Sequence, residues 1–155
     1  MTFSIELRPV GSGAICRSIL AELPEWFGLP ASNAEYAHLA EGGPAWVALA
    51  DHAVVGLMVL KPHFEDTLEI ELLAVRPARH RQGAGRALIA RAEALAAERG
   101  ARFLTVKTRG PSAPDEPYGR TRAFYRAMGF AALEEFTEIW GPENPALLMA
   151  KSVAA

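Results

Sequence analysis

The sequence predicts a mixed α/β domain with a central, mostly antiparallel sheet of six to seven strands and about four helices on both faces. Apolar segments with strand-like patterning recur along the 155 residues, and segments with helical apolar spacing lie between some of them. One strand-helix-strand unit of about 40 residues requires a parallel pair within this mixed sheet. The length suits a single domain, which we expect to span residues 1–155.

The N-terminal third predicts one strand and two helices. Residues 3–7 alternate between apolar and polar side chains, which is typical of a half-buried strand. Residues 12–27 carry apolar side chains at helical spacing, with Ser12 as a candidate cap and Pro24 as a candidate break. A short second helix is predicted over about 32–40, before a Gly-Gly-Pro turn.

The middle of the chain predicts three antiparallel strands. Two apolar runs, 45–50 and 53–60, are separated by Asp51 and His52, which indicates a hairpin. Gly56 is a candidate bulge position. The third strand reads TLEIELLAV at 67–75, and its alternation places four side chains on one face: Glu69, Glu71, Leu73 and Val75.

A helix from Gly83 to about residue 99 follows, with an apolar stripe of period 3.6 and Gly100 as its end signal. A strand over 101–108 completes the parallel unit. Three prolines in 110–119 predict a loop. The chain then predicts one more helix and two final strands, over 121–130, 132–136 and 146–151.

Composition narrows the class of protein. The net charge is −2, which argues against general nucleic-acid binding. A single cysteine, Cys16, cannot form an intrachain disulfide. No apolar run is long enough to span a membrane and no secretory leader is evident, so we expect a cytoplasmic protein. The four histidines show no metal-ligand spacing, so no metal site is expected.

The stretch RHRQGAGR, residues 79–86, has the character of a phosphate site. It follows a strand and opens a helix, where free N–H groups and the helix dipole attract anions. Gly83 and Gly85 would let a phosphate approach the backbone, and three arginines add positive charge. The dinucleotide fingerprint lacks its third glycine, since Leu88 stands there, and a P-loop is absent. The alternative is a tight turn that binds nothing.

The longer stretch LLAVRPARHRQGAGRALIARAEALA resembles the acyl-CoA-binding motif of the GNAT acetyltransferase superfamily. Leu73, Val75 and Pro77 match its first part, and Gly83 and Gly85 match its second. His80 stands where that family more often has Gln or Arg. Downstream, AFYRAMGF resembles the Phe-Tyr-x-x-x-Gly-Phe helix of the same family, and the likeness covers most of 45–151.

This resemblance implies acetyl-CoA as co-substrate and a set of residues that bind it. The strand end would pair with the pantetheine arm, with the Val75 N–H facing the thioester oxygen. The loop and helix start would hold the pyrophosphate. The implied binding residues are Leu73, Ala74, Val75, Arg79, His80, Arg81, Gln82, Gly83, Ala84, Gly85, Arg86 and Tyr125.

The resemblance also implies catalytic residues. Tyr125 would protonate the leaving thiolate, or else it is a core tyrosine. Glu69 and Glu71 are the candidate bases, because two partly buried carboxylates on one face would raise the pKa of at least one. They would otherwise form a solvated face or bind the substrate ammonium without moving protons.

The resulting hypothesis is an N-acetyltransferase (an acyltransferase) that moves an acetyl group directly to a primary amine, most simply of a small molecule. The alternatives are acetylation of a protein N-terminus or lysine, and a non-catalytic acyl-CoA-binding module. The partner is then a small-molecule or peptide amine, with no nucleic acid and no membrane. Sheet edges near the C-terminal strands leave a homodimer open.

Overall fold

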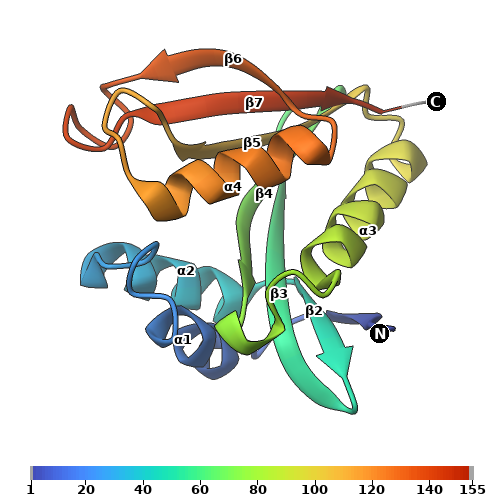
Figure 1. Cartoon of the computed structure of the whole chain (residues 1–155). Helices are drawn as coiled ribbons and strands as arrows, with labels where there is room; N and C mark the ends of the chain where they lie inside the picture. The colour runs from blue at the N-terminus through green and yellow to red at the C-terminus, as the bar shows by residue number, and fades with distance from the viewer. Residues whose placement is uncertain (1, 154–155) are drawn as a thin grey trace. The chain divides into compact units, whose positions relative to one another are not determined.

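The computed structural model describes residues 2–153 (Figure 1). Within these residues the chain forms seven strands, four α-helices and one short 3-10 helix. In chain order they are β1 (Ser4–Arg8), α1 (Gly13–Ala21), α2 (Pro30–Gly42), β2 (Ala45–Ala50), β3 (Ala53–Pro62), β4 (Thr67–Val75), η1 (Pro77–Arg79), α3 (Ala84–Glu98), β5 (Phe103–Arg109), α4 (Glu116–Ala127), β6 (Ala131–Phe136) and β7 (Ala146–Ser152).

The seven strands follow the order β1-β2-β3-β4-β5-β7-β6 in one sheet. The pairs β1/β2, β2/β3, β5/β7 and β6/β7 are antiparallel, whereas β4 and β5 are parallel. The parallel pair is the one that α3 connects. This confirms the predicted fold class, a mixed and mostly antiparallel sheet. No helix within residues 2–153 combines the length and apolarity needed to cross a membrane.

The chain divides into two compact units, which we describe separately. The first comprises Met1–Leu60 and Glu71–Ala92, and the second comprises Lys61–Ile70 and Glu93–Ala155. The strand β4 and the helix α3 each contribute residues to both. That residues 1–155 behave as one domain therefore stays a prediction.

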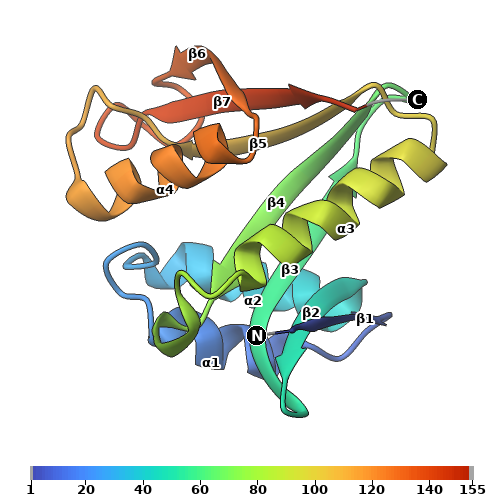
Figure 2. The same ribbon diagram turned by 45° about the vertical axis from the view of Figure 1, so that its right-hand side comes forward.

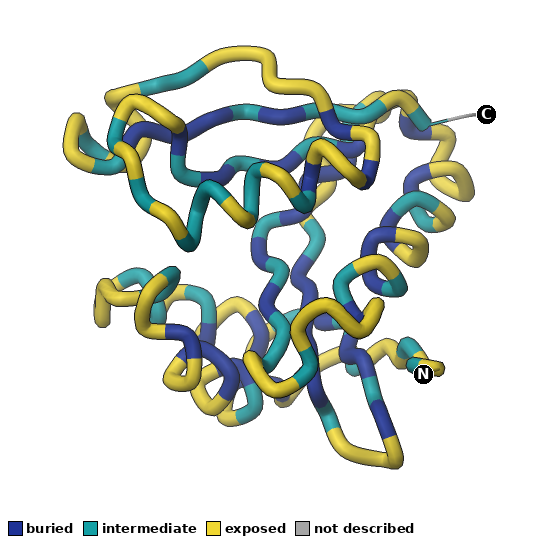
Figure 3. Tube along the Cα trace, viewed as in Figure 1, coloured by how far each residue is buried: buried dark blue, intermediate teal, exposed yellow. Residues whose placement is uncertain are grey.

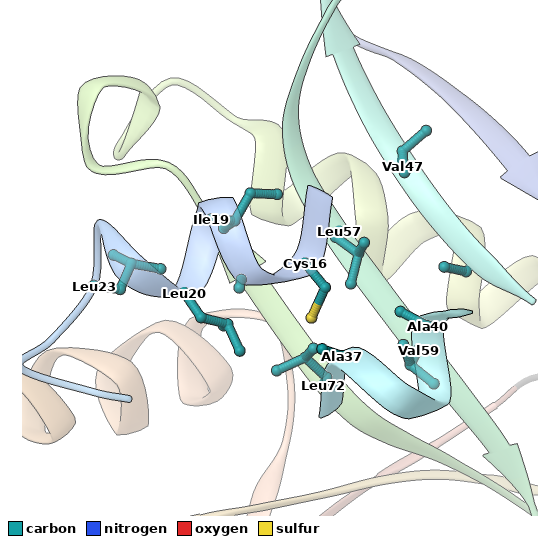
Figure 4. Packing of buried hydrophobic residues seen from close by; sticks show 12 residues of the cluster. Cys16, Ile19, Leu20, Leu23, Ala37, Ala40, Val47, Leu57, Val59 and Leu72 are labelled. Carbon is teal, nitrogen blue, oxygen red and sulfur yellow. The ribbon is translucent and has the colours of Figure 1, made fainter. Parts of the chain in front are cut away.

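The core of the first unit lies between the helices α1 and α2 and the strands β2, β3 and β4 (Figure 4). The two helices run side by side, and both face the sheet (Figures 1 and 2). The buried residues of this cluster are Cys16, Ile19, Leu20, Leu23, Ala37, Ala40, Ala45, Val47, Leu57, Val59, Leu72 and Ala74. Burial of a large aliphatic side chain contributes about 1.5–3 kcal/mol, so this cluster is a main source of stability.

The helix α3 packs on the other face of the first unit's strands. Trp46 points away from the core cluster, because its neighbours Ala45 and Val47 belong to that cluster. The Arg91 guanidinium lies 5.3 Å from the centre of the Trp46 ring. A Cβ placed on Gly56 would lie 3.4 Å from Leu88, so the helix also approaches the sheet closely there. Helices thus cover both faces of this unit.

The second unit is built on β5, which pairs with β4 on one side and β7 on the other. Helix α4 lies alongside β5, and β6 forms the outer strand (Figure 2). Figure 3 shows that β6 is largely exposed, whereas β7 is largely covered. Lys151 joins three elements here: its Nζ donates to Glu93 of α3 at 2.7 Å and to the Met128 carbonyl at 2.5 Å.

The predicted hairpin is confirmed and its turn has a defined geometry. Asp51 and His52 both have positive φ angles, 50° and 67°, which is the pattern of a type I′ turn. The predicted bulge is also present: Ala48 pairs with Gly56 and Leu49 with Val54, so one extra residue lies in β3. The helix end at Gly100 is confirmed as well, since Gly100 has φ 73° and Ala101 N–H donates to the Ala96 carbonyl.

The predicted boundaries of three helices were wrong. Helix α1 ends at Ala21 instead of continuing to 27, three residues before Pro24, which cannot donate a helical hydrogen bond. Ser12 occupies the cap position, but its hydroxyl makes no cap bond. Helix α2 is longer than expected at both ends, and it starts with Pro30, a residue suited to a first helical turn.

The third error concerns α4. It begins at Glu116, so the last four residues of the predicted loop 110–119 are helical, and it ends at Ala127 instead of 130. Asp115 caps it, with its carboxylate accepting from Tyr118 N–H at 3.2 Å. Pro117 lies in the first turn, where no N–H is needed, and so it does not oppose the helix.

Candidate active site

The turn between β4 and α3 has an unusual backbone. Strand β4 ends at Val75, η1 follows, and α3 starts at Ala84. Gly83 has φ 98°, a left-handed conformation that favours glycine, and Arg81 adopts φ 63°. A Cβ on Gly83 would meet only the Phe3 ring, at 3.9 Å. Conformation, and not crowding by the described protein atoms, therefore accounts for glycine at this position.

The same turn carries positive charge. The first N–H groups of α3 have no acceptor within the helix, and the helix dipole adds partial positive charge there. Arg81 and Arg86 are exposed, and neither has an ion-pair partner among residues 2–153. Arg79 is half-buried, Gln82 donates to the Ala78 carbonyl at 3.3 Å, and Ala84 is buried. These donors suit a phosphate or pyrophosphate group.

His80 folds back onto the strand that precedes the turn. Its Nε2 lies 2.7 Å from the Val75 carbonyl oxygen, which can only accept, so this nitrogen carries a hydrogen. Its ring meets the Trp26 ring edge-on at 5.8 Å. In β4 itself, Ala74 is buried, and Leu73 and Val75 are half-buried. His80 thus ties the end of β4 to the loop.

Arg76 fixes the end of β4 further. Its backbone N–H donates to the Val55 carbonyl at 2.8 Å, and its Nε donates to the Val54 carbonyl at 3.0 Å. Its guanidinium also pairs with Glu22 and contacts Ser18 in the residues around α1. The turn therefore starts from a strand end that is anchored to both β3 and α1.

Glu69 of β4 lies at the centre of a polar cluster that the sequence did not predict. Its side chain is only 8% exposed. Oε1 lies 2.7 Å from His63 Nε2, and Oε2 accepts from Lys107 Nζ at 2.7 Å. We call these residues the Glu69 cluster. Lys107 lies on the same face as Glu69, because Glu69 pairs with Thr105 and Lys107 follows two residues later. Sequence patterning alone does not fix this register.

The expected rise of a carboxyl pKa is not found at Glu69. Burial raises the pKa of this carboxyl, but its hydrogen bonds and charge interactions with Lys107 and His63 outweigh burial. The net result is a pKa of Glu69 below the ordinary carboxyl value of 4.5. The error arose because the sequence indicated a second carboxylate nearby and gave no sign of two cationic or hydrogen-donating partners.

Glu71 lies two residues further along β4 and is half-buried. Among the described residues it has no hydrogen-bond or ion-pair partner for its side chain. It belongs to the first unit, whereas Glu69 belongs to the second. The two candidate bases thus differ sharply in surroundings although they share a strand.

Tyr125 of α4 is buried, with 5% of its surface exposed. Its ring packs edge-on against Phe124 at 5.3 Å and Phe130 at 5.5 Å. The Phe130 N–H donates to the Tyr125 carbonyl at 3.0 Å, which closes the end of the helix. The Phe-Tyr-x-x-x-Gly-Phe pattern therefore forms one aromatic cluster, in which Gly129 turns the chain with φ 97°.

The fold and this turn define a class of proteins, acyltransferases that use acetyl-CoA. The family model of the acetyltransferase (GNAT) family matches residues 14–130, about three quarters of the sequence, and the chain belongs to this family. The match includes the strand, turn and helix of the positively charged site and also Tyr125. No curated protein matched the sequence.

Solved structures share the fold. A GNAT-family protein from Desulfovibrio desulfuricans has a TM-score of 0.80 and 22% identity, covering 99% of this chain and 100% of its own. The aminoglycoside 6'-N-acetyltransferase from Enterococcus faecium has a TM-score of 0.72 and 18% identity, covering 98% of each chain. A GNAT acetyltransferase from Elizabethkingia anophelis, with acetyl-CoA bound, has a TM-score of 0.70 and 19% identity, covering 96% and 97%.

Proposed function

We propose that this enzyme moves the acetyl group of acetyl-CoA directly to a primary amine of a small molecule. The observation that carries the proposal is the left-handed turn at Gly83 before α3, together with the charges of Arg81 and Arg86, which have no ion-pair partner within residues 2–153. A glycine at a helix start lets a phosphate approach the backbone N–H groups of the first turn, which favours phosphate binding there. Family membership supplies the acetyl donor.

On the donor side, we assign the turn residues to the pyrophosphate and the end of β4 to the pantetheine arm. The turn residues are Arg79, His80, Arg81, Gln82, Gly83, Ala84, Gly85 and Arg86. The backbone of Leu73, Ala74 and Val75 would pair with the pantetheine arm as if the arm were a further strand. The Val75 N–H would then donate to the carbonyl oxygen of the thioester. Bound acetyl-CoA supplies a thioester carbonyl that an amine can attack.

On the catalytic side, we assign the general acid to Tyr125. Its ring is buried within its own aromatic cluster, which restricts the orientation of the side chain and so favours a proton donor at a defined position. Glu69 and Glu71 remain the candidate bases from the sequence. The buried and paired state of Glu69 makes it less suited to direct proton abstraction than the half-buried Glu71.

On the acceptor side, we propose a cationic amine. The turn before β4 exposes two carboxylates, Glu65 and Asp66, which would attract an ammonium group. A protein N-terminus or a lysine carries the same charge. A panel of small polyamines, amino sugars and peptides with free amines therefore separates a small-molecule enzyme from a protein-modifying one.

The donor site is tested by titrating acetyl-CoA into the wild type and Gly83→Glu. The variant places a bulky anion at the proposed phosphate site, so we expect binding to weaken by about 100-fold or more. Gly100→Glu is the matched control, because Gly100 also has a positive φ, 73°, and open space around it. Equal binding by Gly83→Glu and the control would contradict the assignment.

The catalytic assignment is tested with Tyr125→Phe. The ring still fills the aromatic cluster, so the fold and acetyl-CoA binding should persist. Loss of the proton donor should reduce kcat for thiol release by about 10²–10⁴-fold. Turnover at the wild-type rate would remove Tyr125 from the reaction and leave it as a core residue.

A further inference from the structure

Backbone contacts distinguish the two edges of β4 near its end. The Arg76 N–H donates to the Val55 carbonyl at 2.8 Å, so it faces β3. The Ala74 carbonyl faces β3 as well, because its oxygen would lie 3.3 Å from a Cβ placed on Gly56. In a strand the N–H and the carbonyl of one residue point to the same edge, and the edge alternates from residue to residue. Both backbone groups of Val75 therefore point to the edge away from β3.

The Val75 carbonyl on that edge is already bonded to the side chain of His80. Nε2 of His80 lies 2.7 Å from the oxygen and carries a hydrogen, because a carbonyl can only accept. The parallel pairing of β4 with β5 runs over residues 67–70 of β4, and Val75 lies further along the strand. The partner that the structure gives to this carbonyl is thus an imidazole and not a neighbouring strand.

The imidazole is held from a second side. Its ring meets the Trp26 ring edge-on, with the ring centres 5.8 Å apart, and Trp26 packs against the core cluster of the first unit. The peptide group that joins Val75 to Arg76 is bonded on both edges, its carbonyl to His80 and its N–H to Val55. All of these residues belong to the first unit. The last peptide group of the strand therefore has a fixed orientation.

Acetyl-CoA has the spacing needed to pair with both backbone groups of Val75. The number of bonds from its thioester carbonyl carbon to the nearest amide nitrogen equals the number from one peptide carbonyl carbon to the second amide nitrogen after it. A thioester oxygen that accepts from the Val75 N–H therefore brings this amide N–H to the Val75 carbonyl, as in a parallel ladder. A carbonyl oxygen has two lone pairs, so the bond from His80 leaves one for the arm.

We propose that His80 is a positioning residue for the acetyl donor. By holding the Val75 carbonyl, its side chain fixes where the pantetheine arm pairs with β4, and therefore where the thioester lies. This deepens the proposed function and rests on it. The backbone of His80 belongs to the proposed phosphate turn, whereas its imidazole acts on the strand that receives the arm.

The hydrogen bonds that shape the phosphate turn do not involve this imidazole. The Arg79 N–H donates to the Arg76 carbonyl at 2.9 Å, and the Gln82 side chain donates to the Ala78 carbonyl at 3.3 Å. Loss of the His80 side chain should therefore affect ligands that contain the pantetheine arm and spare ligands that contain only the phosphates. A general collapse of the turn would weaken both kinds of ligand alike.

Titrations with acetyl-CoA and with ADP, which carries a diphosphate without the arm, separate the two effects. In His80→Ala we expect the affinity for acetyl-CoA to fall about 3- to 10-fold and that for ADP to stay within about twofold. On an accepted amine, kcat should fall further, by about 10- to 100-fold, because the thioester is misplaced. His80→Gln keeps an N–H donor for the Val75 carbonyl and should recover most of both losses. His38→Ala is the control, since it removes an exposed imidazole on α2.

The hydrogen bond itself is tested without any ligand. Nitrogen NMR of histidine-labelled protein should show neutral His80 protonated on Nε2 and unprotonated on Nδ1. A proton on Nδ1 in place of Nε2, or equal losses of acetyl-CoA and ADP affinity in His80→Ala, would overturn the inference. So would a His80→Ala enzyme within about twofold of the wild type in both affinity and kcat. Absence of acetyl-CoA binding by the wild type would instead overturn the proposed function itself.

Discussion

Glu69 is held in its charged form by two neighbours, which links this residue to the stability of the protein. Its folded-state pKa lies below the ordinary value of 4.5 for such a carboxyl group. A carboxyl with a lowered folded pKa contributes stability that is fully present above its unfolded pKa. That contribution is lost as the pH falls through the folded value. The cluster should therefore weaken in acid and be intact at neutral pH.

Glu69→Gln should lower the free energy of unfolding by about 1–3 kcal/mol at pH 7, because Lys107 loses a charged acceptor. The difference from the wild type should shrink as the pH falls through the lowered folded-state pKa of Glu69, because the wild-type carboxylate then also becomes protonated. Urea unfolding at a series of pH values measures it. A difference that stays constant or grows in acid would contradict the lowered pKa.

For single residues, the sequence indicated candidates but not their surroundings. Gly83, Tyr125 and Glu69 were proposed as site residues from a motif, an aromatic pattern and strand alternation. The partners of Glu69 were not, because His63 and Lys107 are separated from it by six and 38 residues and meet it only through pairing across strands. Hydrogen-bond partners of a buried carboxylate depend on register, which sequence patterning alone does not fix.

Among the elements, helix α4 depends most visibly on one local feature. Asp115 accepts from the Tyr118 N–H at 3.2 Å and lies 3.8 Å from an Arg109 nitrogen. The cap explains why the helix begins within a proline-rich stretch. A proline breaks a helix only when it falls in the helix interior, and Pro117 falls in the first turn.

Asp115→Ala should destabilise the protein by about 1 kcal/mol through loss of the cap. Asp115→Asn is the matched variant, since it keeps a capping oxygen and removes only the charge facing Arg109. We expect it to retain most of the stability. Thermal unfolding of the two variants compares them. Equal losses would show that the charge, and not the cap, supports α4.

Across the whole molecule, the fold class followed from the apolar patterning of the strands and helices and from one crossover unit. The position of β7 between β5 and β6 was not predicted. Boundaries were less accessible, as α1 and α4 show, because caps and prolines act within a few residues. The division into two units could not be read from the sequence. Strand β4 and helix α3 each have one continuous pattern in the sequence, although each contributes residues to both units.

The single cysteine, Cys16, allows the independence of the two units to be measured. Burial raises the pKa of the Cys16 thiol to about 11, although the charge of Arg17 opposes the rise, and the residue is 1% exposed in the first unit's core. The native protein should thus resist a thiol-specific dye at pH 8, and labelling should report opening events. The rate of labelling then measures how often the core around Cys16 opens spontaneously.

Two core truncations, one in each unit, test whether the units open together. Leu57→Ala lies in the first unit and Leu104→Ala in the second, both fully buried, and each should cost about 2–5 kcal/mol. If the chain opens as one cooperative domain, both variants should speed Cys16 labelling in proportion to their loss of stability. If only Leu57→Ala speeds the labelling, the two units of this acetyltransferase open independently. Its substrates then bind to a protein in which one unit can open while the other stays folded.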